Sequence, residues 1–104
     1  MKRIFISQKM KDKSAEDIQA VRKKAIEDVR RIYGDEEVEI IDSYFEDFDP
    51  KKGCVPLKYL AKSLELLADA DLAYFADDGY RTTRGCFVEY YCASKYDIPT
   101  ILAE

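Results

Sequence analysis

The chain has 104 residues, of which 47% are hydrophobic and 37% are charged, so we expect one domain with a modest core over residues 1–104. The net charge of −4 lacks the basic excess that a nucleic-acid polymer requires, which argues against such a partner. The absence of histidine excludes Ser-His and Cys-His nucleophile pairs and His-based zinc sites within one chain.

The first half of the chain predicts a strand, a helix and a second strand. A run of three apolar residues predicts a strand over residues 2–7 and is too short for a signal-peptide core or a membrane span. Ser14, with Asp17 three residues later, resembles a capping box and predicts a helix that Gly34 ends. Residues 38–42 predict the second strand. The apolar stripe expected to bury this first helix comprises Ile18, Val21, Ala25, Val29 and Ile32.

The second half continues the alternation. A helix is expected to begin at Pro56, because the N–H that proline lacks would have no partner in the first turn of a helix. The residues that this helix is expected to bury are Leu57, Leu60, Ala61, Leu64, Leu67 and Ala68. An apolar strand over residues 72–76, a loop over 77–83, a helix over 84–96 and a strand over 99–103 follow. This order predicts a small three-layer α/β domain with a four-stranded parallel sheet, Rossmann/flavodoxin-like in type.

Ligands of open parallel sheets bind beyond the carboxyl ends of the strands, where the strand order reverses. Several polar or small residues of this chain are expected at that edge. For Asp77 and Asp78, a solvated turn before Gly79 is an equally good interpretation. The residues that a ligand is expected to meet are Ser7, Gln8, Asp42, Asp77, Asp78, Arg84 and Gly85.

One carboxylate stands out by its position. Glu89 follows Gly85 by four residues, on the same helix face, and helical side chains lean toward the N-terminus. The glycine is expected to leave space for a substrate, and the helix N-terminus to favour the ionised carboxylate that a nucleophile needs. On spacing alone, an ordinary solvated glutamate is the alternative.

The three cysteines, Cys54, Cys86 and Cys92, form no CxxC pair, and their odd number fits no closed disulfide framework. We therefore expect reduced thiols in a cytoplasmic protein, with packing as the role of Cys86. We expect no metal, no cofactor and no membrane partner. A domain this small makes a homo-oligomer an expected source of further stability.

Three segments together resemble a known family. Ala70-Asp71 opens an apolar strand, Arg84-Gly85 and Glu89-Tyr-Tyr-Cys-Ala93 lie on the next helix, and Ile98-Pro99-Thr-Ile leads into the last strand. This pattern resembles the nucleoside 2-deoxyribosyltransferase family. The Ile-Ser-Gln start makes the chain similar to a group of short bacterial and phage proteins, the DUF4406 group.

The resemblance implies a nucleoside or nucleotide substrate and chemistry at its N-glycosidic bond, by 2-deoxyribosyl transfer or by hydrolysis. Glu89 matches the nucleophile that attacks C1′, and Asp71 matches the acid that handles the leaving base. Phe5 stands where the family often has a tyrosine near the nucleophile, so the resemblance implies that it contacts the substrate, although it brings no hydroxyl. A non-catalytic module that binds or sequesters a nucleotide-derived molecule is the alternative function, and a structural oligomer is a third.

Overall fold

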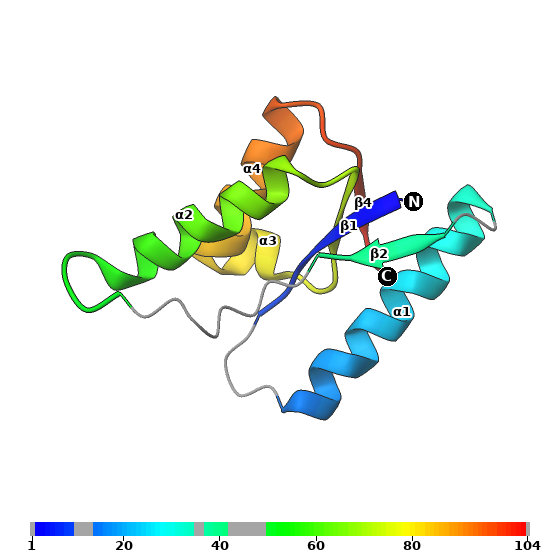
Figure 1. Cartoon of the computed structure of the whole chain (residues 1–104), viewed down its shortest axis with the longest axis horizontal. Helices are drawn as coiled ribbons and strands as arrows, with labels where there is room; N and C mark the ends of the chain where they lie inside the picture. Colours follow the sequence, from blue (N-terminus) through cyan, green and yellow to red (C-terminus); the bar gives the residue numbers. More distant parts are fainter. Residues whose placement is uncertain (1, 10–13, 35–36, 42–49, 104) are drawn as a thin grey trace.

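The computed structural model describes residues 2–9, 14–34, 37–41 and 50–103 (Figure 1). Its strands are β1 (Lys2–Ser7), β2 (Val38–Ile40), β3 (Leu72–Phe75) and β4 (Thr100–Leu102). Its helices are α1 (Ala15–Tyr33), α2 (Val55–Ala68), α3 (Gly79–Thr82) and α4 (Arg84–Lys95). All strand pairs are parallel, in the order β2-β1-β3-β4, which confirms the predicted four-stranded parallel sheet.

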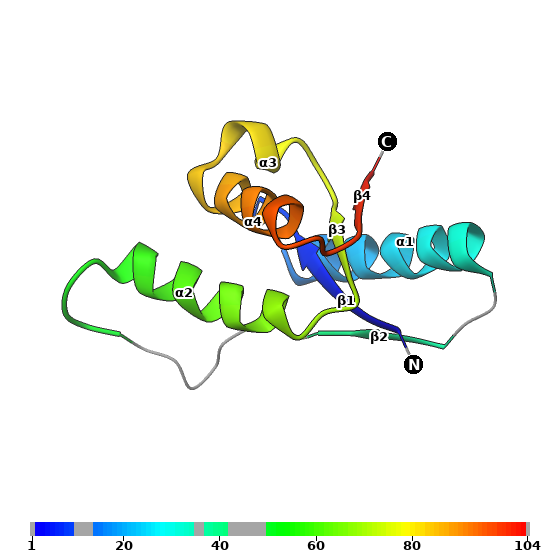
Figure 2. The same ribbon diagram turned by 90° about the horizontal axis from the view of Figure 1, so that it is seen from above.

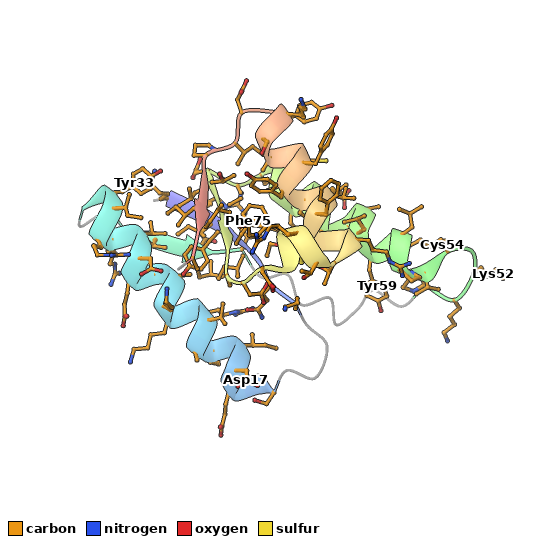
Figure 3. All side chains as sticks on the ribbon, turned by 180° about the vertical axis from the view of Figure 1, so that it is seen from behind. Asp17, Tyr33, Lys52, Cys54, Tyr59 and Phe75 are labelled. Atoms are coloured by element: carbon orange, nitrogen blue, oxygen red, sulfur yellow. The ribbon has the colours of Figure 1, made fainter. Side chains whose placement is uncertain are left out.

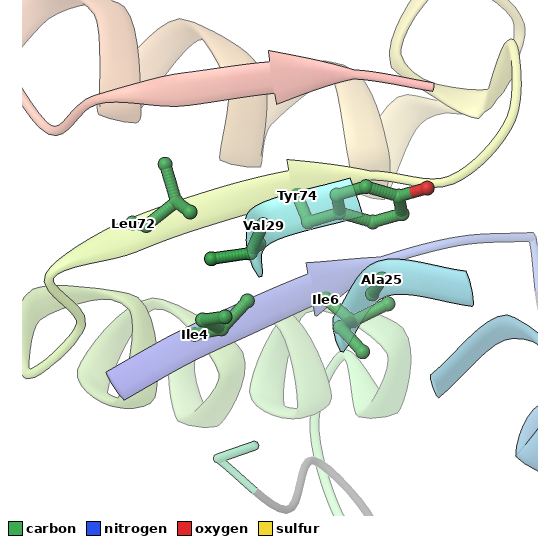
Figure 4. Packing of buried hydrophobic residues seen from close by; sticks show 6 residues of the cluster. All are labelled: Ile4, Ile6, Ala25, Val29, Leu72 and Tyr74. Carbon is green, nitrogen blue, oxygen red and sulfur yellow. The ribbon is translucent and has the colours of Figure 1, made fainter. Parts of the chain in front are cut away.

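The helices cover the sheet on two sides, so the domain has three layers (Figure 2). Helix α1 packs on one face, where Ala25 and Val29 meet side chains of β1 and β3 (Figure 4). Helices α2 and α4 pack on the other face. The buried residues there are Phe5, Leu67, Ala73, Phe75 and Ala93. β3 is buried on both faces, as its apolar sequence predicts for a strand between helix layers.

Helix α1 begins and ends where the sequence predicts. The Ser14 hydroxyl accepts the Asp17 N–H at 3.1 Å and the Asp17 carboxylate accepts the Ser14 N–H at 3.1 Å, which is a complete capping box. Gly34 ends the helix with φ of 90°, a conformation that favours glycine. The predicted burial is wrong for Ile32, which lies in the last turn and is 53% exposed, because it borders an open hollow beside β4.

Helix α2 starts at Val55 with Pro56 in its first turn, as predicted, but its predicted buried stripe is wrong for the three residues that are exposed, Leu57, Ala61 and Ala68. Of that stripe only Leu67 is fully buried, and Leu57 is 60% exposed. The reason is geometric, because the N-terminal half of α2 extends past the sheet and only its C-terminal half packs on the domain (Figures 1 and 2).

The segment after β3 is not simply the predicted loop, because it contains the one-turn helix α3. Four residues with no apolar periodicity give no helical pattern in the sequence. The strand order shows where on this fold a ligand is expected to bind. The chain steps from β1 outward to β2 and then returns to place β3 on the other side of β1. The strand order therefore reverses between β1 and β3, and the carboxyl ends of these two strands form the expected ligand edge.

Candidate functional site

The carboxyl end of β1 brings Glu89 and Ser7 together. Ser7 is the last residue of β1 and Glu89 lies in the middle of α4, 82 residues later. The Ser7 hydroxyl donates a hydrogen bond to Glu89 Oε1 at 2.7 Å, and both side chains are buried, with 3% and 8% exposed. The structure therefore places Glu89 at the predicted edge, and it is not an ordinary solvated glutamate.

Burial controls the protonation of this carboxyl group. Loss of hydration raises the pKa of Glu89 to about 7, and the hydrogen bond from Ser7, which lowers the pKa, offsets only part of that rise. The prediction that the helix N-terminus keeps Glu89 ionised is wrong. Glu89 lies beyond the first turn of α4, where the helix dipole is weak, and desolvation decides instead.

Aromatic rings pack together next to the segments that carry the Ser7–Glu89 pair. Phe75 is the register partner of Ser7, and Figure 3 shows it at the centre of the molecule. Its ring meets Tyr80 edge-on with the centroids 6.2 Å apart and Tyr90, the residue after Glu89, with the centroids 5.3 Å apart. These rings belong to the apolar cluster on the face of the sheet that α2 and α4 cover.

Three other predicted residues lie near Ser7 or Glu89 along the chain. Arg84 and Gly85 form the first turn of α4, with Arg84 exposed, and Gln8 follows Ser7 directly and is half-buried. A Cβ atom placed on Gly85 would meet no atom within 4 Å among the described residues, which agrees with the expected open space one turn before Glu89. Asp42 lies outside the described residues.

Two aspartates after β3 link the edge to the segment after β1. The Asp77 carboxylate accepts the Lys9 N–H at 3.0 Å through Oδ2 and the Gly79 N–H at 2.9 Å through Oδ1. The Lys9 ammonium meets Asp78 Oδ1 at 2.6 Å, which lowers the pKa of Asp78 and raises that of Lys9. Asp78 is therefore an ionised acceptor at neutral pH and is not an acid.

Asp71 does not join the site, so the prediction that it acts with Glu89 is wrong. Its carboxylate accepts the Arg3 N–H at 2.8 Å, at the amino end of β1. Ser7 lies four residues further along β1, a distance of about 13 Å at the usual rise per residue. Asp71 also donates its own N–H to the Arg3 carbonyl, so its role is to pair the starts of β1 and β3.

We expect Asp71→Ala to reduce stability and to leave the chemistry of Glu89 intact. Loss of one hydrogen bond to a carboxylate lowers the free energy of unfolding by about 1 kcal/mol, or Tm by roughly 4–8 °C in a domain of this size. Thermal unfolding measures the effect, and Asp69→Ala, an exposed neighbour, is the matched control. A loss of activity without a loss of stability would return Asp71 to the site.

Phe5 does not line the site either, so its predicted contact with a substrate is wrong. Side chains alternate along a strand, so Phe5 and Ser7 share a face, but Phe5 lies one repeat deeper under α2 and α4. It is 1% exposed and packs with Leu67 and Ala73. The hydroxyl that Phe5 lacks is present two residues later, in Ser7.

A second polar cluster lies on the opposite face of the sheet. The buried Tyr74 hydroxyl donates to Asp28 Oδ2 at 2.6 Å, and Lys24 and Arg31 pair with the same carboxylate at 2.7 and 3.1 Å. These groups satisfy one another beside a surface hollow of about 510 Å³ between α1 and β4. They account for a buried tyrosine hydroxyl and leave Glu89 as the stronger candidate.

An apolar hollow of about 400 Å³ lies between α2 and α4, remote from the strand-end residues. Within the described ranges, no group of three or more cysteines, aspartates and glutamates is arranged to hold a metal ion. The same part of the chain contains no helix that is both long and apolar enough to cross a bilayer. The three cysteines are free thiols, and Cys86 is buried beside Gly79, in agreement with a packing role.

Two features of this edge were not predicted from the sequence. One is the Ser7–Glu89 hydrogen bond, and the other is the role of Asp77 as an acceptor of two backbone N–H groups. The strand order sets the ends of β1 and β3 side by side, but both contacts also depend on how α4 and the segment after β3 pack there, for which the sequence has no local signal. A comparison of the chain with protein-family models, with curated proteins and with solved structures finds no match.

Proposed function

We propose that this protein cleaves or transfers at the N-glycosidic bond of a nucleoside or nucleotide, with Glu89 as the nucleophile. One observation carries the proposal. A buried carboxyl group, bonded to a serine hydroxyl, lies at the point where the strand order of a parallel sheet reverses. The likeness of residues 70–101 to the nucleoside 2-deoxyribosyltransferase pattern supports the choice of substrate class.

The geometry suits a two-step displacement. Ser7 holds Oε1, so Oε2 is the oxygen that attacks C1′. The Oε2–C1′ bond forms while the C1′–N bond breaks, and the base leaves with the electron pair and takes a proton from water. In the second step, water or another base attacks C1′ and releases the Glu89 carboxylate. This is the double-displacement logic of retaining glycosidases.

The other groups at the edge then bind the substrate. Asp78, kept ionised by Lys9, accepts hydrogen bonds from the N–H donors of the base. Arg84, Gly85 and Gln8 border the sugar or its phosphate. With a pKa of about 7, Glu89 is ionised in about half of the molecules at neutral pH, so the reaction speeds up as the pH rises through 7.

We also propose that the chain works in the cytoplasm and as a homo-oligomer. The free thiols fit a reducing compartment. Helix α4 and the residue that follows it expose Phe87, Tyr91 and Tyr96, each with more than half of its surface accessible. Large exposed aromatic residues are typical of surfaces that bury themselves in an interface.

Product analysis with a panel of deoxynucleosides and their 5′-monophosphates, with and without a second base, tests the function. We expect released or exchanged base from the native protein, and a loss of at least a thousandfold in Glu89→Gln. Glu27→Gln, which removes an exposed carboxylate from α1, is the matched control and should keep full activity. Binding without turnover would instead favour the sequestering module, and absence of binding would leave a structural role.

A further inference from the structure

Asp77 extends the hydrogen-bond ladder between β1 and β3 by one step. The ladder ends where the Ser7 carbonyl accepts the Ala76 N–H at 2.9 Å. In a parallel pair the next donor on the β1 side is the N–H of Lys9, which would reach a backbone carbonyl. Here it reaches Asp77 Oδ2 at 3.0 Å instead. A side chain therefore continues the pairing past the point where the two backbones separate.

The second oxygen of Asp77 holds the segment that leads to α4. Oδ1 accepts the Gly79 N–H at 2.9 Å, and the Gly79 carbonyl in turn accepts the N–H and the hydroxyl of Thr83, the N-cap of α4. Gly79 lies very close to the side chains of Asp77 and Lys9. A Cβ atom on Gly79 would lie 2.8 Å from Asp77 Oδ1 and 3.0 Å from Lys9 Cγ, so these contacts require glycine.

We propose that Asp77 is a positioning residue that sets the geometry of the Ser7–Glu89 pair. Ser7 lies two residues before Lys9, and α4, which carries Glu89, follows the turn held by Gly79. One carboxylate thus ties together the two segments that present the two partners of the 2.7 Å hydrogen bond. The expected effect of Asp77 on the reaction rate rests on the function proposed above. The hydrogen-bonded link between the two segments does not depend on that function.

Both oxygens of Asp77 make hydrogen bonds within the protein, since each accepts a backbone N–H. Carboxylates commonly accept N–H groups in this way at helix starts and turns. The contacts of Asp77 are therefore those of a residue that holds two backbone segments.

Asp77→Asn tests the proposal, because an amide keeps one acceptor and turns an NH₂ donor toward the other N–H. We expect kcat to fall ten- to a hundredfold with KM within about twofold, and the rise of rate with pH that Glu89 produces to persist. Asp69→Asn, which makes the same change at an exposed aspartate before the other end of β3, is the control for activity. Loss of a limb of the pH–rate profile would overturn the proposal, since Asp77 would then transfer a proton to the substrate.

A second measurement needs no turnover, so it separates this inference from the proposed function. Amide hydrogen exchange should show protected N–H groups at Lys9 and Gly79 in the native protein and faster exchange at both in Asp77→Asn. The ¹³C shift of the Glu89 carboxyl carbon should change in Asp77→Asn and stay unchanged in Asp69→Asn. Equal exchange in native and variant proteins, or an unchanged Glu89 signal, would overturn the positioning role even if the enzyme is active.

Discussion

Replacement of Glu89 by glutamine is expected to stabilise the fold at neutral pH by about 3 kcal/mol. The pKa of Glu89 is about 7 in the folded protein and near the ordinary glutamate value of 4.5 in the unfolded chain. Between these values the folded state keeps a proton that the unfolded state has released. The free energy of unfolding therefore falls as the pH rises, by up to about 1.4 kcal/mol per unit, until Glu89 ionises in the folded protein.

Glutamine removes this dependence because its amide carries no charge, and its oxygen still accepts the hydrogen bond from Ser7. The stability difference between Glu89→Gln and the native protein should thus be small below pH 4.5 and should reach its full size above pH 7. Urea unfolding at intervals from pH 4.5 to 8 measures it, with the exposed Glu27→Gln as the control that gives a constant difference. A constant difference for Glu89→Gln as well would mean that this carboxyl group is not buried in solution.

A stability gain from the loss of a catalytic group has a physical explanation. A carboxylate in a poorly hydrated site is costly to ionise, and a function that uses the carboxylate, such as the proposed reaction, compensates for that cost during selection. The same variant that should unfold later should also lose turnover. For a nucleophile, the substitution is expected to raise stability and lower activity. For a structural residue such as Asp71, the substitution is expected to lower stability alone.

The elements of the fold could be predicted because their signals are local. The apolar period of α1 and its capping box lie within 20 residues, and the uninterrupted apolar run of β3 shows burial on both faces. The N-terminal half of α2 shows the limit of such signals. Its leucine stripe is as regular as that of a buried helix, but Leu57 is exposed because the sheet does not extend beneath it.

The errors at the site have two different causes. Asp71 comes immediately before β3, so parallel topology alone places it at the amino edge of the sheet, opposite to Glu89. The prediction that Asp71 acts with Glu89 followed the family motif and conflicts with this topology. The protonation of Glu89 has no such local sign. It depends on how closely α4 packs over Ser7 and Phe75, which are far away in sequence, so a spacing of four residues from Gly85 could locate the carboxylate but not its hydration.

Removal of the Ser7 hydroxyl is expected to shift the pH dependence of activity toward higher pH. The hydrogen bond from Ser7 to Glu89 Oε1 stabilises the ionised carboxylate and lowers its pKa against the effect of burial. Without it, a smaller fraction of Glu89 is ionised at pH 6. A hydrogen bond to a charged group is worth about 1.5 kcal/mol or more, so we expect Ser7→Ala to be about tenfold less active than the native protein at pH 6.

Above pH 9, where Glu89 is ionised in both proteins, the difference should shrink to the part that depends on orientation. Pre-steady-state and steady-state rates from pH 5.5 to 9.5 separate these two contributions, and Ser7→Thr, which restores a hydroxyl at the same position, should return the midpoint toward that of the native protein. Ser94→Ala, on the exposed face of α4, is the control for loss of a serine hydroxyl. If Ser7→Ala lowered the rate equally at every pH, the hydroxyl would act on the substrate or on the direction of the carboxylate, and its influence on the ionisation of Glu89 would be disproved.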